Sequence, residues 1–63
     1  MITDAQDKRL TEYKNILAVD ISEQLPDEGF AAFCRIKGYL QALVDLGQID
    51  ETEMAELVKK YTF

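Results

Sequence analysis

The stretch from Leu46 to Glu53 constrains the fold most, because it carries the end signal of one helix and the start signal of the next. Gly47 suits the left-handed backbone position just beyond a helix C-terminus, where a side chain would be strained. Asp50 is a good N-cap, since its carboxylate can accept a hydrogen bond from the amides of the first turn. Glu53 stands in the reciprocal position of a capping box. The sequence therefore predicts a helical hairpin in the C-terminal half.

A repeating pattern of apolar residues predicts a first helix over residues 4–23. The repeat has steps of three and four residues, which is typical of an amphipathic helix. Its members are Leu10, Tyr13, Leu17 and Ile21. Thr3 is a suitable N-cap for this helix. Pro26 disfavours helical backbone at the residue before it, so the helix should end near residue 23.

Ile16 and Val19 lie outside the narrow apolar stripe of this first helix. At about 100° per residue, they project from a different face than Leu17 does. The apolar face is therefore wide at the C-terminal end of the helix, or the helix makes a second contact there. The sequence leaves both alternatives open.

The remaining apolar spacings predict a second helix over residues 28–46 and a third over residues 51–61. No window alternates with period two for long enough to indicate a strand. We therefore expect an all-α fold, a small three-helix domain over residues 1–63 with antiparallel neighbours and a C-terminal helical hairpin. The predicted core consists of Leu10, Tyr13, Leu17, Phe33, Ile36, Leu40, Leu43, Leu57 and Val58.

The chain has 63 residues, one cysteine (Cys34) and no histidine. A domain of this size buries only about 60% of the surface that its unfolded chain exposes, so its stability is marginal without help. A single cysteine excludes an intrachain disulfide, and one thiol without histidine makes no zinc site. A second subunit or a partner chain is the remaining source of stability, so we expect the domain to be dimeric or bound to a partner.

The N-terminal residues contain neither a basic segment nor an apolar segment of the kind found in secretory signals. No apolar run approaches the about 20 residues that span a bilayer. Together with the single cysteine, these features predict a soluble, cytoplasmic protein without membrane contact. The net charge of −5 is common among such proteins.

Catalytic chemistry is not expected. Without histidine, the commonest general base near neutral pH is missing, and Cys34 lacks the partner that would activate its thiol. A chain this small also leaves little room for a pocket that excludes water. We predict that the protein is not an enzyme, has no catalytic residue, and binds no metal and no cofactor.

Direct binding of nucleic acid is disfavoured by the charge pattern. The second and third predicted helices could be mistaken for a helix-turn-helix, in which the start of the second helix meets the major groove. Here that start carries Asp50, Glu51 and Glu53, which would repel phosphates. The weaker alternative is a basic patch, formed by Arg35, Lys37, Lys59 and Lys60.

The second helix also carries a stripe of small residues roughly opposite its large apolar face. Gly38 within a helix costs about 0.5–1 kcal/mol relative to alanine, and the usual compensation is a second backbone that comes close. The stripe is therefore a candidate interface with a partner or a second copy, unless it is ordinary surface or covered by the first helix. With its bordering residues, the small-residue strip comprises Ala31, Cys34, Arg35, Gly38, Tyr39 and Ala42.

These features predict a small acidic regulator that acts by protein–protein contact without chemistry of its own. Short cofactorless proteins of this kind are often inhibitors or antirepressors made by phages and other mobile elements, an analogy at the level of class alone. One alternative is a structural or assembly subunit of a larger complex. A third alternative is a nucleic-acid-associated protein that uses the basic patch.

Overall fold

A capped first helix begins the fold, as the sequence predicts. The computed structural model describes residues 1–62, and α1 runs over Asp4–Ser22. The Thr3 hydroxyl accepts a hydrogen bond from the Gln6 amide at 3.2 Å, and the Gln6 side-chain oxygen accepts one from the Thr3 amide at 2.9 Å. These two bonds form a capping box, which satisfies two amides at the start of the helix. The Thr3 prediction is confirmed.

The turn after α1 is tighter than the sequence predicts, because α2 runs over Pro26–Asp45 and begins two residues before the expected start. Proline is well suited to the first position of a helix, where its missing N–H would have no partner anyway. Pro26 therefore starts α2 as well as ending the segment before it. Gln24 adopts the left-handed conformation with φ 58°, and the Leu25 amide donates to the Asp20 carbonyl at 2.9 Å.

In the turn between α2 and α3, Gly47 and Asp50 act as predicted, whereas Glu53 does not complete a capping box. Gly47 has φ 74°, and the Gln48 amide donates to the Leu43 carbonyl at 2.9 Å, which closes a Schellman motif. The Asp50 carboxylate then accepts from the Glu53 amide at 2.7 Å and caps α3, Glu51–Tyr61. The Glu53 carboxylate accepts from the Met1 ammonium at 3.0 Å, a bond that the sequence pattern did not indicate.

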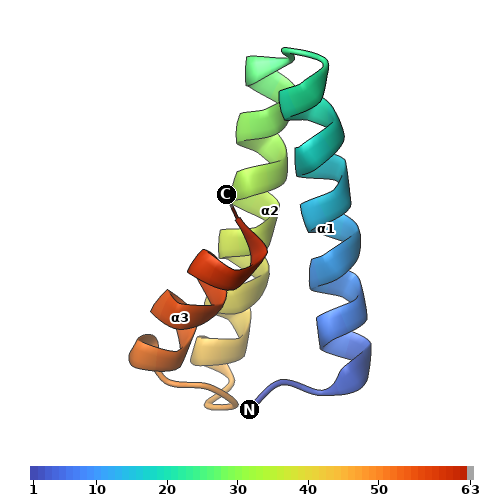
Figure 1. Cartoon of the computed structure of the whole chain (residues 1–63). Coiled ribbons are helices and arrows are strands. Elements are labelled where there is room, and N and C mark those ends of the chain that lie inside the picture. Colours follow the sequence, from blue (N-terminus) through green and yellow to red (C-terminus); the bar gives the residue numbers. More distant parts are fainter. Residues whose placement is uncertain (63) are drawn as a thin grey trace.

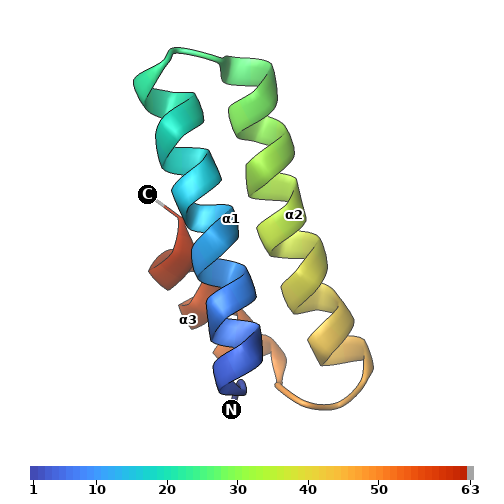
Figure 2. The same cartoon turned by 90° about the vertical axis from the view of Figure 1, so that its right-hand side faces the viewer.

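Within residues 1–62 the fold contains three helices and no strand, so the all-α prediction is confirmed. Figures 1 and 2 show α1 and α2 as a long antiparallel hairpin, with α3 lying across the part that holds the start of α1 and the end of α2. The molecule is elongated, with extents of 35 × 19 × 15 Å.

The core agrees with the prediction at its centre and differs at its edges. Five predicted residues are buried: Leu10, Leu17, Ile36, Leu40 and Leu43. The other four are only half-buried: Tyr13, Phe33, Leu57 and Val58. Three further residues complete the buried apolar set: Ala32, Ile49 and Tyr61. Tyr13, Leu57 and Val58 still pack against the core from its rim.

The third helix is too short to cover the whole hairpin. It has 11 residues, whereas α1 has 19 and α2 has 20. At a rise of 1.5 Å per residue, α3 spans about 16 Å, against about 30 Å for the two long helices. Its final turn contacts the middle of α1, where the Lys60 carbonyl accepts a hydrogen bond from the Lys14 ammonium at 3.1 Å. We call residues 15–34 the open end of the hairpin and the remainder the closed end.

Candidate protein-contact surface

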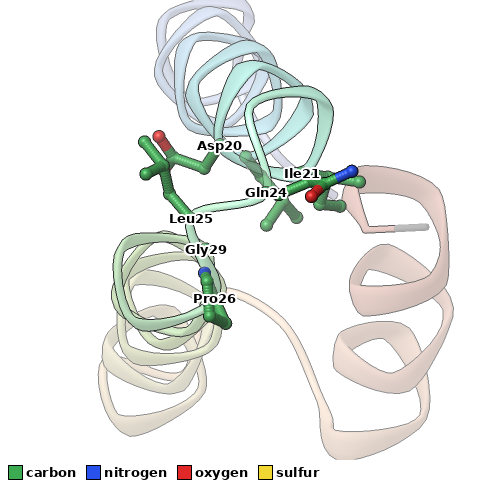
Figure 3. A pocket seen from close by; sticks show the side chains of 7 residues that line it. Asp20, Ile21, Gln24, Leu25, Pro26 and Gly29 are labelled. Carbon is green, nitrogen blue, oxygen red and sulfur yellow. The ribbon is translucent and has the colours of Figure 1, made fainter.

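The open end contains an apolar groove between the end of α1 and the start of α2. Its volume is about 450 Å³, and it is lined by Leu17, Asp20, Ile21, Gln24, Leu25, Pro26 and Gly29. Figure 3 shows Ile21 and Gln24 directed toward the side of the hairpin where α3 lies, while Asp20 and Leu25 are directed to the opposite side. Leu17 is buried and lies within 3.9 Å of the position that a Cβ atom at Gly29 would occupy.

Gly29 lies where the two helices approach each other, although a Cβ atom would fit there without a clash. It is buried, and a Cβ atom there would lie 3.8 Å from the Asp20 Cβ. Such a distance is ordinary van der Waals contact. The bottom of the groove is therefore formed by tightly apposed helices, whereas its side toward α3 is left without a third helix.

Large apolar side chains of the open end are exposed or only half-buried. Ile21 is 55% exposed, although it belongs to the same stripe as the buried Leu10 and Leu17. Phe30, on the first turns of α2, is 68% exposed. Phe33 is half-buried, and the Lys37 ammonium lies 5.6 Å from the centre of its ring. The prediction that Phe33 belongs to the buried core is wrong, because α3 ends before it can cover this part of α2.

A second, shallower apolar surface lies on another face of α1. A groove of about 260 Å³ is lined by Asn15, Ile16, Val19 and Asp20. Ile16 is 43% exposed and Val19 is 53% exposed. Both side chains are therefore exposed within the chain, and the choice between a wide apolar face and a second contact with a partner stays open.

The small-residue strip lies on the outer surface of α2. Ala31, Cys34, Arg35, Gly38 and Ala42 are all exposed. A Cβ atom at Gly38 would meet nothing within 4 Å, so α1 does not cover this glycine. Tyr39 is half-buried because its ring packs edge-on against Tyr13 of α1, with ring centroids 6.1 Å apart. The strip is thus continuous surface, and its role as an interface stays a prediction.

The basic residues of the predicted patch are spread over two helices. Arg35, Lys37, Lys59 and Lys60 are all exposed. The Lys37 ammonium lies over Phe33, and the Lys60 ammonium lies 5.2 Å from the centre of the Tyr61 ring. Two of the four cations therefore lie against aromatic rings of their own helices.

At the closed end, hydrogen bonds between side chains join α3 and the turn before it to α1. The Tyr61 hydroxyl donates a hydrogen bond to the Asp7 carboxylate and joins the end of α3 to the start of α1. Burial, followed by the hydrogen bond and the negative charge of Asp7, raises the pKa of Tyr61 to about 12. The side-chain amides of Gln6 and Gln48 hydrogen-bond to each other and join α1 to the turn before α3. Among residues 1–62, no three His, Cys, Asp or Glu side chains are grouped as a metal site would need.

The groove was not predicted from the sequence, although two signals for it were present. The apolar stripe of Leu10 and Leu17 continues to Ile21, near the end of α1. The predicted third helix was also visibly shorter than the other two. Joined, these observations would have predicted an uncovered segment on the hairpin.

Comparisons of the chain with protein-family models, with curated proteins and with solved structures found no match in any of the three. None of the helices within residues 1–62 combines the length and the apolar character that crossing a membrane requires.

Proposed function

We propose that this chain is a small protein-binding regulator of the inhibitor or antirepressor type, which acts by contact and carries out no chemistry itself. The observation that supports this proposal most is the open end of the hairpin. There the apolar stripe of α1 continues to Ile21 without a third helix to cover it, beside the groove of about 450 Å³. Apolar surface that is exposed beside a groove is typical of protein interaction sites.

The small-residue strip is a second candidate contact surface for the same function, either with a partner or in a homodimer. Gly38 supports it, because a helix-interior glycine that meets no other part of the chain has no packing reason within the monomer. An assembly subunit of a larger complex is the alternative function, and it would use the same surfaces. The two functions differ in what is bound, since a regulator has one target and an assembly subunit has several neighbours.

Affinity capture with matched variants tests this proposal. The wild-type chain and three variants, Ile21→Ser, Val19→Ser and Gly38→Leu, are used as bait in lysate of the source cells, and every captured protein is then purified and titrated. We expect one partner that binds the wild type and Val19→Ser and is lost with Ile21→Ser. Val19 is the matched control, because it is 53% exposed on the same helix, against 55% for Ile21.

Other outcomes are equally informative. Loss of binding with Gly38→Leu but not with Ile21→Ser would move the contact to the small-residue strip. A set of proteins from one complex would favour the assembly subunit. If no purified protein binds the wild type better than it binds any variant, the proposed function is wrong.

A further inference from the structure

The side of α1 that faces α3 continues beyond the end of α3. Asp7, Lys14 and Ile21 are spaced by seven residues, so they lie within about 40° of one another around the helix. Asp7 bonds to Tyr61, and Lys14 bonds to the carbonyl of Lys60 in the last turn of α3. Ile21 is directed to the same side (Figure 3), but it is 55% exposed. The layer that α3 forms on the hairpin therefore ends near Lys14.

Phe33 of α2 belongs to the same uncovered side. Tyr13 lies about 20° from Asp20 around α1, and Asp20 is directed away from α3 (Figure 3). The rings of Tyr13 and Tyr39 contact each other edge-on, so Tyr39 marks the far side of α2. Phe33 lies about 120° from Tyr39 around α2, with the buried Ile36 between them. The uncovered side of the open end is therefore apolar on both long helices.

The acidic residues of the open end point away from this side. Glu23 lies about 160° from Ile21 around α1. Asp27 and Glu28 lie about 120° and 140° from Phe33 around α2. We call residues 20–28 the acidic tip, because they contain every charged residue of the open end: Asp20, Glu23, Asp27 and Glu28. An occupant of the uncovered side therefore meets apolar side chains, with the negative charge at the end of the hairpin.

The basic residues gather where the open end begins. Lys14 and Arg35 are equally far from the turn between α1 and α2, about 14 Å along the helices. Lys60 lies at the same level, since its carbonyl accepts a hydrogen bond from the Lys14 ammonium. Five of the seven basic residues thus form what we call the basic belt: Lys14, Arg35, Lys37, Lys59 and Lys60. The belt and the acidic tip are separated by the length of the uncovered side.

We infer that a second copy of this chain covers the open end, with the two hairpins antiparallel and related by a two-fold axis. The uncovered sides of the two hairpins lie on each other, so that Ile21 and Phe33 of each copy are covered by apolar side chains. Each hairpin occupies the space beyond the end of the other copy's α3, and its turn stops against the last turn of that helix.

The charges favour this register. It places each acidic tip at the level of the other copy's basic belt, where opposite charges attract. The two acidic tips are then about 14 Å apart, which exceeds the distance of about 8–10 Å over which salt screens exposed charges. An arrangement with the tips side by side would instead bring two charges of −4 together.

The contact is small, so the dimer is weak. It spans about 14 Å along the hairpin and the width of two helices, about 20 Å, which buries less than the about 1,200 Å² of a stable interface. We expect a dissociation constant between about 10 µM and 1 mM. The inference goes beyond the proposed function, because it assigns the occupant of the groove in the free chain. A target that contacts Ile21 has to displace this second copy.

Sedimentation equilibrium from about 10 µM to 1 mM tests the dimer. All chains carry Cys34→Ala, because the exposed thiol could form a disulfide between copies. Ile21→Ser should raise the dissociation constant about tenfold, whereas Val19→Ser should change it less than about twofold. Val19 is the matched control, since it is 53% exposed and lies about 160° from Ile21 around α1. Circular dichroism verifies that both variants keep the helical content of the parent.

The sign of the charge effects tests the register. Raising the salt concentration should weaken the dimer, because it screens the attraction between tip and belt. Glu23→Gln/Asp27→Asn should raise the dissociation constant about threefold at low salt. Asp4→Asn/Glu51→Gln removes the same charge from exposed residues of the closed end and should have a smaller effect.

A spin label tests the orientation of the two copies. A nitroxide is attached to Asp27→Cys in chains without ¹⁵N, and these are mixed with unlabelled ¹⁵N chains, so that any broadening arises between copies. The amides of residues 59–61 should broaden more than those of residues 23–28.

The failures of the inference and of the proposed function are distinguishable. If the chain stays monomeric at 1 mM while a captured partner still requires Ile21, the inference is wrong and the proposed function stands. Equal effects of Ile21→Ser and Val19→Ser, or a dimer that only Gly38→Leu dissociates, would move the interface away from the open end. A dimer that is strengthened by salt or by Glu23→Gln/Asp27→Asn, or stronger broadening of residues 23–28, would overturn the antiparallel register.

Discussion

The two ends of the α1–α2 hairpin differ in how completely their apolar side chains are covered. At the closed end, Leu10, Ile36 and Leu40 have no exposed surface, and Tyr61 of α3 is only 2% exposed. At the open end, Leu17 and Ala32 are buried between the two long helices, but Ile21 and Phe30 remain more than half exposed. The same two helices thus contribute to a complete core at one end and an incomplete one at the other.

This difference shows that helical periodicity alone does not predict burial. The apolar stripe of α1 extends from Leu10 to Ile21 at helical spacing, yet its members range from 0% to 55% exposed. The cause is the length of α3, whose last turn is fixed to α1 at Asp7 and Lys14. Beyond that point, an apolar side chain of α1 has only α2 to pack against.

The largest expected difference between the two ends is in the effect of truncating an apolar side chain. Leu40→Ala should lower the free energy of unfolding by about 2–5 kcal/mol, because it leaves a cavity in a fully covered core. Ile21→Ala should lower it by less than about 1 kcal/mol, because the side chain is already 55% exposed. Urea unfolding followed by circular dichroism measures both values.

If Leu40→Ala does not fold, Ile36→Val provides the comparison, with an expected loss of about 0.5–1.5 kcal/mol. If Ile21→Ala lowers the free energy of unfolding more than Ile36→Val does, the apolar side chains of the open end are covered as completely as those of the closed end.

The bond between Tyr61 and Asp7 makes the closed end sensitive to alkaline pH. The pKa of Tyr61 is 10.0 without the protein environment and about 12 in the fold, so the unfolded chain loses this proton first as pH rises. The contribution is complete below pH 10 and is lost between pH 10 and 12. Urea unfolding across this range should show the decline in the wild type and a smaller decline in Tyr61→Phe.

Tyr39→Phe is the matched control, since Tyr39 is half-buried and contacts α1 through its ring. It should keep the steep decline of the wild type. If the free energy of unfolding falls equally with pH in the wild type and in Tyr61→Phe, the hydrogen bond of Tyr61 does not stabilise the packing of α3 on α1.

A smaller effect is expected at the two turns between helices. Each turn contains one residue in the left-handed conformation, which is Gln24 after α1 and Gly47 after α2. Gly47→Ala should destabilise by about 1 kcal/mol, because a side chain at φ 74° is strained. Gln24→Gly should stabilise by less than that amount, because it relieves strain at φ 58° while adding freedom to the unfolded chain. Thermal unfolding measures both, and a destabilised Gln24→Gly variant would contradict the strain at the open-end turn.

The sequence predicts best those features of the fold that depend only on residues close together in the chain. The caps at Thr3 and Asp50 and the turn at Gly47 depend on neighbouring residues, and all three are confirmed. From the sequence, Pro26 predicts a break between helices, whereas in the structure it is the first residue of α2, since proline suits both roles.

Features that depend on relative helix length were harder to predict. The half-buried state of Phe33, the burial of Tyr61 and the open groove all follow from where α3 ends against α1. Periodicity identifies which residues share a face, but it does not say which part of a partner helix lies opposite them. For the same reason, the small-residue strip could be located on α2 but not assigned an occupant.

Native-state hydrogen exchange of the free chain, followed residue by residue by NMR, tests most directly whether the two ends differ in this way. Amides of residues 10–14 and 40–43 should exchange only through global unfolding, because the covered core holds them. Amides of residues 18–21 and 30–32 should exchange at least about tenfold faster, through local opening of the two-helix end. Uniform protection along α1 and α2 would contradict an incompletely covered open end.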